Sequence, residues 1–177
     1  MIAKTDNSFI KDALFISYTG LKDYTRCPRS YYLKNIYRDP KTGYKLQIAS
    51  PSMTLGAVVH DVIKWFLQMQ GQVNKEQLIQ KYRNLWLKYR GKKGGFATRE
   101  DEASFGKRGL KMLDNFFANT KVLEPNLKTD DFLKFKIDET TFLNGRVDFL
   151  GQLPDGSVHV LDFKTGFEDI FQQIFKY

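Results

Sequence analysis

The stretch Leu143–Gly166, LNGRVDFLGQLPDGSVHVLDFKTG, decides how the C-terminal third of this chain folds. Two apolar arms flank Pro154-Asp155-Gly156, where proline presets one backbone angle and glycine accepts a positive φ, so the pattern predicts a β-hairpin. The arms also carry Asp148, Asp162 and Lys164, which are costly to bury unless they bind something. Asp162 and Lys164 are two residues apart and should leave one face of a strand, with Asp148 on the neighbouring arm.

Two carboxylates and an ammonium on one patch suit a divalent metal ion with a cationic group beside it. Alternating Asp and Lys are also typical of a solvent-facing strand edge, and D-x-K alone does not separate the two interpretations. Gly145-Arg146 before Asp148 extends the pattern to G-x-x-D, a hairpin and D-x-K-T-G. In this longer form the stretch resembles motifs II and III of the RecB-like branch of the PD-(D/E)XK nuclease superfamily.

The resemblance implies an α/β fold with a restriction-endonuclease-like core, in which a mixed β-sheet with an antiparallel meander is flanked by helices and follows a helical N-terminal half. The pattern of apolar and polar residues predicts the strands of this meander over 132–138, 142–151 and 157–163. By the same resemblance Asp148, Asp162 and Lys164 are the catalytic residues. The two carboxylates would be metal ligands with the backbone carbonyl of Phe163, and Lys164 would orient or activate water or stabilise charge on the phosphate.

The helix expected over residues 52–71 has a wide apolar face and a cap at Ser52 or Thr54. A single histidine in such a helix is more often structural than a ligand. Gly56 to His60 nevertheless reads G-x-x-x-H, the first motif of the family, which implies that His60 joins the metal site. Since imidazole coordinates Mn²⁺ well and Mg²⁺ poorly, we expect Mg²⁺ or Mn²⁺ as cofactor, with a preference for Mn²⁺.

Residues 15–38 have the aromatic, amphipathic pattern of helices packed on a core, capped by Ser17 or Thr19, with Pro28 marking a kink or a second helix. The order S-Y-T-G-L-x-x-Y-x-x-C-P-x-x-Y-Y also closely resembles the N-terminal signature of RecB-like nucleases. In part of that family the cysteine matching Cys27 joins three others around a [4Fe–4S] cluster. Because Cys27 is the single cysteine and a cubane cluster normally needs four thiolates, we expect no iron–sulfur cluster from this chain.

Two further segments are candidates for DNA contact. Between helices expected over 74–90 and 100–120, the cations Arg90, Lys92 and Lys93 alternate with glycines and predict a flexible basic loop, either solvated surface or a grip on phosphates. Gln173 and Tyr177 read Q-x-x-x-Y, which follows the catalytic strand in the family and would bear on the DNA or brace the site. On a helix these two residues share a face, although the segment also reads as a short amphipathic tail.

Length and charge set the remaining expectations. At 177 residues we expect a loose leader over 1–14 and a single nuclease-like domain over 15–177, whose C-terminal end we expect to be incomplete because the family core usually continues with a strand and a helix. The excess of Lys and Arg over Asp and Glu is 28 − 20 = +8, which favours a polyanionic partner. A single cysteine and the lack of a long apolar run favour the cytoplasm and no membrane partner.

The function expected from these patterns is a metal-dependent DNA nuclease. It would act as an exonuclease on DNA ends or single strands, in repair or recombination or in CRISPR or phage DNA processing, with a helicase, recombination or CRISPR-acquisition partner. Two alternatives stay open: a nuclease fold that has lost activity and binds DNA, and a nuclease fold that serves as a protein scaffold.

Overall fold

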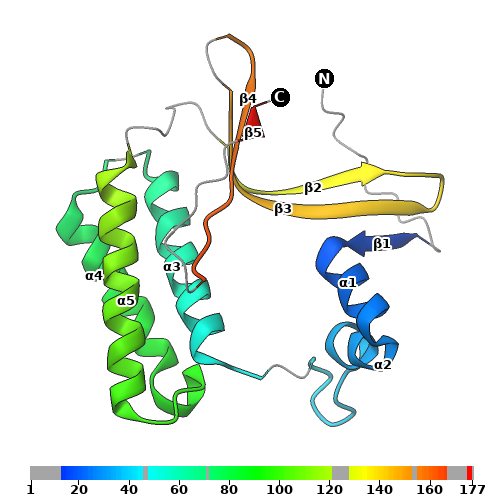
Figure 1. Cartoon of the computed structure of the whole chain (residues 1–177), viewed down its shortest axis with the longest axis horizontal. Coiled ribbons are helices and arrows are strands. Elements are labelled where there is room, and N and C mark those ends of the chain that lie inside the picture. Colours follow the sequence, from blue (N-terminus) through cyan, green and yellow to red (C-terminus); the bar gives the residue numbers. More distant parts are fainter. Residues whose placement is uncertain are drawn as a thin grey trace. The chain divides into compact units, whose positions relative to one another are not determined.

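The structure is a computed structural model that describes residues 13–45, 48–70, 72–120, 128–152, 155–166 and 175–176. Five helices, three short helical turns and five strands follow one another in these ranges (Figure 1). In order they are β1 (Leu14–Ser17), α1 (Tyr18–Arg26), α2 (Pro28–Tyr31), the π-helix η1 (Tyr32–Ile36), α3 (Pro51–Gln68), α4 (Lys75–Trp86), the 3₁₀ turns η2 (Leu87–Tyr89) and η3 (Gly91–Gly94), α5 (Arg99–Ala118), β2 (Lys128–Lys136), β3 (Thr141–Gln152), β4 (Val158–Leu161) and β5 (Phe175–Lys176).

The chain forms two compact units that share strand β3. The first unit comprises Met1–Gln47 and Phe132–Arg146, and the second comprises Ile48–Asp131 and Val147–Tyr177. Thr141–Asn144 of β3 pairs in parallel with β1, and Phe149–Gln152 pairs antiparallel with β4, which pairs antiparallel with β5. Strand β2 also pairs with β3. The predicted α/β architecture, with a mixed sheet after a helical half, is confirmed. The prediction of one domain over 15–177 stays a prediction.

The first unit begins with a strand that the sequence analysis did not predict. Leu14–Ser17 pairs with the start of β3, so the predicted leader ends before Leu14, and residues 1–12 lie outside the described ranges. The side chain of Ser17 then caps α1 by accepting a hydrogen bond from Gly20 N, as predicted. Pro28 occupies the first turn of α2, the second of the two predicted alternatives. No described residue of α1, α2 or η1 is buried.

Helices α3, α4 and α5 lie side by side and form the helical layer of the second unit (Figure 1). The predicted apolar face of α3 is confirmed, and it packs on buried residues of α4, α5 and the sheet. This core contains Leu55, Val58, Val59, Val62, Ile63, Phe66, Leu78, Tyr82, Met112, Leu113, Phe116, Phe149, Leu161 and Phe163.

Helix α3 begins one residue before its expected start, and its capping residue differs from the prediction. Ser50 caps the helix by accepting a hydrogen bond from Met53 N, because Pro51 has no N–H and suits the first helical position. Ser52 or Thr54 was therefore the wrong choice of cap. The Thr54 hydroxyl is buried and donates instead to the carbonyl of Gly94 at 3.0 Å.

The predicted hairpin is confirmed, but its second arm is shorter than expected. Gly156 has a φ of 84° in the turn, where Asp155 Oδ1 accepts a hydrogen bond from Ser157 N at 2.9 Å. Strand β4 ends at Leu161, so residues 162–165 continue beyond the strand. Phe175–Lys176 forms strand β5, so these two residues are not helical, and Gln173 and Tyr177 lie outside the described residues. A bilayer-spanning helix is not found in the described parts of the chain, since every helix there is too short or too polar.

Candidate active site

Asp148 lies at the centre of the candidate site, which falls wholly within the second unit. Its position follows from the hairpin, whose register pairs the next residue, Phe149, with Leu161. Phe149 is buried in the core, so Asp148 leaves the opposite face of β3. Its Oδ2 atom accepts a hydrogen bond from Phe163 N at 2.7 Å, which ties β3 to the segment that follows β4.

His60 of α3 meets Asp148 across 88 residues of sequence. Its Nδ1 atom lies 3.2 Å from Asp148 Oδ1, and the side chains are 35% and 19% exposed. The hydrogen bond to Asp148 raises the pKa of His60 above 6.5, and although burial opposes this, the charges of Asp148 and Asp162 add to it. Burial raises the pKa of Asp148, but the hydrogen bonds from His60 and Phe163 N outweigh burial and leave it lowered. The pair is therefore an ion pair at mildly acid pH.

Asp162 and Lys164 form the outer part of the site. The Lys164 ammonium contacts Asp162 Oδ2, and both side chains are about half exposed. We predicted that they share a strand face, but they lie past the end of β4 and meet across Phe163. Phe163 itself is 5% exposed and packs edge-on against Phe116, so the core holds the middle residue of D-F-K while its neighbours face solvent.

The donor atoms suit a hard divalent cation. Two carboxylates, a backbone carbonyl and one imidazole form the kind of oxygen-rich set that Mg²⁺ and Mn²⁺ accept. Within the ranges that the structure describes, however, no group of three or more His, Cys, Asp or Glu side chains is arranged to hold an ion. His60 and Asp148 are bonded to each other, and Asp162 turns to Lys164. Lys164 contacts one carboxylate oxygen of Asp162, and a carboxylate has a second oxygen that can accept an ion.

Arg108 of α5 is a site residue that the motifs did not reveal. Its Nη2 atom donates to the carbonyl of Thr165 at 3.3 Å and also to the carbonyl of Gly166. Thr165 also approaches α3 closely, because a Cβ added to Gly56 would lie 3.1 Å from its Oγ1 atom. Apolar periodicity indicates only that Arg108 lies in an amphipathic helix. A contact between its guanidinium and backbone carbonyls could not be predicted from that pattern.

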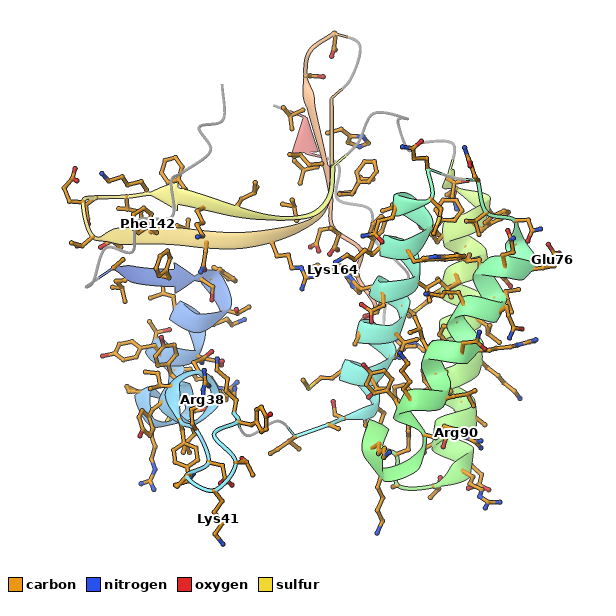
Figure 2. The ribbon with its side chains drawn as sticks, turned by 180° about the vertical axis from the view of Figure 1, so that it is seen from behind. Arg38, Lys41, Glu76, Arg90, Phe142 and Lys164 are labelled. Atoms are coloured by element: carbon orange, nitrogen blue, oxygen red, sulfur yellow. The ribbon has the colours of Figure 1, made fainter. Side chains whose placement is uncertain are left out.

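The predicted basic loop is folded into a compact turn. Glu102 accepts hydrogen bonds from Arg90 Nε at 3.1 Å and from Gly91 N at 2.9 Å, and Gly94 is buried. A flexible loop was therefore the wrong prediction, because the glycines here permit close packing. Lys92 and Lys93 are exposed. Figure 2 shows Arg90 at one end of the helical layer, away from Lys164.

Three other residues that the sequence analysis named are Gln173, Tyr177 and Cys27. Gln173 and Tyr177 lie outside the described residues. Cys27 is exposed at the junction of α1 and α2, in the first unit. The absence of an iron–sulfur cluster stays a prediction.

Comparison with known proteins now gives the family. The sequence model of the PD-(D/E)XK nuclease superfamily matches residues 16–172. This chain belongs to the PD-(D/E)XK nuclease superfamily. A search of the curated proteins found no match. Membership makes the fold restriction-endonuclease-like and places the chain among nuclease-type enzymes, which act on nucleic acid such as DNA and generally use divalent metals such as Mg²⁺.

Proposed function

We propose that this PD-(D/E)XK chain is a metal-dependent DNA nuclease of the RecB-like branch, with Asp148, Asp162 and Lys164 as its catalytic residues and His60 in its metal site. The contact of His60 with Asp148 carries the proposal, because it brings residues from a helix and a hairpin 88 positions apart to one point. The hydrogen bond from Phe163 N to Asp148 brings the D-F-K segment to the same point. If these residues only formed a solvent-facing strand edge, contacts between His60, Asp148 and the D-F-K segment would not be expected.

Phosphodiester hydrolysis requires a water that is deprotonated near neutral pH and a phosphate whose added negative charge is stabilised. A bound Mg²⁺ or Mn²⁺ supplies both effects. Asp148 and Asp162 would hold the ion, with His60 and the Phe163 carbonyl as further ligands. The ammonium of Lys164 stands beside Asp162 on an exposed side chain, so it can reach a water or a phosphate oxygen.

DNA is the proposed substrate, and the chain would cut it from its ends or in single strands. The proposed context is repair or recombination, or CRISPR or phage DNA processing. A helicase, recombination or CRISPR-acquisition protein is the proposed partner. The net charge of +8 supports a polyanionic substrate. The exposed Lys92 and Lys93 are proposed phosphate contacts, and Gln173 and Tyr177 are proposed to bear on the DNA. Arg90 belongs to this set as well, although it would have to share its guanidinium between a phosphate and Glu102.

The test is cleavage of end-labelled single- and double-stranded DNA with Mg²⁺ or Mn²⁺ by wild type, Asp162→Ala and Lys164→Ala. Each variant should lose activity about a hundred-fold or more while keeping the fold. Asp61→Ala and Lys107→Ala are matched controls, because they remove the same charges at exposed positions of α3 and α5 and should cleave normally.

Cleavage that survives in both site variants would refute the proposal. Metal-independent DNA binding by a wild-type protein that does not cleave would instead indicate an inactive DNA-binding module. A stable protein partner without DNA affinity would indicate a scaffold.

A further inference from the structure

Among the described residues, the segment that carries Asp162 and Lys164 lies beyond the paired part of strand β4. Strand β4 ends at Leu161, where its pairing with β3 also ends. The described hydrogen bonds that hold the next residues come from side chains. Upstream of Lys164, Asp148 accepts from Phe163 N at 2.7 Å. In the described part of the chain, side-chain hydrogen bonds therefore hold this backbone, and its position depends on each of them.

Arg108 supplies the anchor downstream of Lys164. Its Nη2 atom carries two hydrogens and donates to two successive carbonyls, those of Thr165 and Gly166. Hydrogen bonds from an ionised donor are about twice as strong as neutral ones. Lys164 therefore stands between a carboxylate anchor on one side and a guanidinium anchor on the other.

Helix α3 approaches the same segment at Thr165. A side chain at Gly56 would press on the Thr165 hydroxyl, since an added Cβ would lie 3.1 Å from its oxygen. Gly56 precedes His60 by about one helical turn. Thr165 is therefore positioned by Arg108 of α5 and by Gly56 of α3. A shift of Thr165 would change the distance between the D-F-K segment and α3, the helix that carries His60.

We propose that Arg108 is a positioning residue of the active site. By holding the carbonyls of Thr165 and Gly166, it fixes the backbone on which Asp162 and Lys164 stand. Its catalytic consequence depends on the proposed nuclease function, but its effect on the backbone does not. A displacement of about 1 Å at a reacting group can cost a hundred-fold in rate, so this anchor matters for catalysis without touching the substrate.

The first experiment measures amide hydrogen exchange of the metal-free protein. Arg108→Met keeps an apolar stem and removes the donors, whereas Lys107→Met removes an exposed cation from the adjacent position of α5. We expect exchange across residues 162–166 to become about ten-fold faster in Arg108→Met and to stay at the wild-type rate in Lys107→Met. Exchange in α3 should not change in either variant. Wild-type exchange of residues 162–166 in Arg108→Met would overturn the proposal.

The second experiment separates kcat from KM with DNA and Mn²⁺. Arg108→Met should lower kcat about 10- to 100-fold and leave KM within about two-fold, because the anchor orients catalytic groups and does not bind DNA. A rise in KM at unchanged kcat would overturn the positioning role. If the wild type does not cleave at all, the nuclease proposal fails while the exchange measurement still decides whether Arg108 holds the segment.

A third variant guards against simple misfolding. Arg108→Lys keeps a cation with several donors on a shorter reach, so exchange at 162–166 and kcat should both lie between those of wild type and Arg108→Met. If Arg108→Met unfolds, Arg108→Lys alone decides the matter. In a folded Arg108→Lys protein, exchange at 162–166 that is faster than in wild type supports the anchor, whereas exchange at the wild-type rate overturns it.

Discussion

Gly109→Ala should destabilise the helical layer by about 2 kcal/mol, because α5 passes Tyr82 of α4 too closely for a methyl group. A Cβ at position 109 would lie 2.2 Å from the Tyr82 hydroxyl oxygen and 2.6 Å from Cζ. Tyr82 is only 2% exposed, and its hydroxyl donates to the carbonyl of Gly106 at 3.1 Å. An alanine must therefore displace a buried ring or separate the two helices.

Three terms give the magnitude. Forcing an extra carbon into a packed core costs about 1–3 kcal/mol. Losing the Tyr82 hydrogen bond costs about 0.5–1.5 kcal/mol. Replacing glycine by alanine inside a helix returns about 1 kcal/mol. The balance is about 2 kcal/mol of lost stability, which corresponds to a Tm lower by about 4–8 °C for a chain of this length.

Gly106→Ala is the matched control on the same helix. An added Cβ there would lie 3.6 Å from Trp86, which is an ordinary contact, so the helix propensity gain of about 1 kcal/mol should remain. Urea unfolding followed by far-UV circular dichroism should move the two midpoints in opposite directions. A Gly109→Ala protein as stable as wild type, or two variants shifted in the same direction, would refute this account of the packing between α4 and α5.

Three shorter predictions concern the site and its support. In metal-free protein the pKa of His60 is raised, so its pair with Asp148 stabilises the fold fully below the unfolded pKa of 6.5. This stabilisation is lost as the pH rises through the pKa of His60 in the folded protein. It is also lost in strong acid, when Asp148 is protonated at its lowered pKa. Urea midpoints should therefore separate wild type from His60→Gln more widely at about pH 5.5 than at about pH 8.5, and an equal gap would contradict the pairing. Thr54→Val should lose about 1 kcal/mol by leaving the Gly94 carbonyl without its 3.0 Å donor, whereas an unchanged urea midpoint would show that water replaces the hydroxyl. Cleavage should stop in EDTA and should be faster after addition of Mn²⁺ than after addition of Mg²⁺ at the same concentration. Equal rates would contradict the role of the His60 imidazole as a metal ligand.

The site residues stay a prediction, but the sequence motifs named residues that the structure brings together, whereas they did not name the residues that support them. Motifs at fixed spacing singled out His60, Asp148 and the D-F-K residues. The hairpin and the segment after it bring Asp148 close to D-F-K, and helix α3 brings His60 to Asp148. Arg108 was missed because its partners are backbone carbonyls, which leave no trace in residue type. Strand β1 was missed for a related reason, since four residues with no clear alternation acquire a strand identity only from pairing with β3.

The basic turn after α4 shows the opposite failure. Glycines beside lysines predicted mobility, yet Gly94 lies where a Cβ would come within 2.4 Å of the Phe96 ring, and Gly95 has a φ of 78°. Gly94 permits close approach of the Phe96 ring, and Gly95 permits a left-handed backbone conformation. Both are required by the packing of the turn. A single sequence states that glycine is present but not which of its two properties is used, so this segment could not be assigned before the fold was known.

Phe163 explains how the exposed side chains of the candidate site can have defined positions. A lysine and an aspartate that are half exposed gain little from their own ion pair, because water competes for both charges. Phe163 between them is buried against Phe116 and donates its N–H to Asp148. Since its ring is fixed in the core, the two neighbouring residues must leave the backbone on the solvent side. The geometry of the charged pair is thus set by apolar packing and backbone hydrogen bonds, and the ion pair only adds to it.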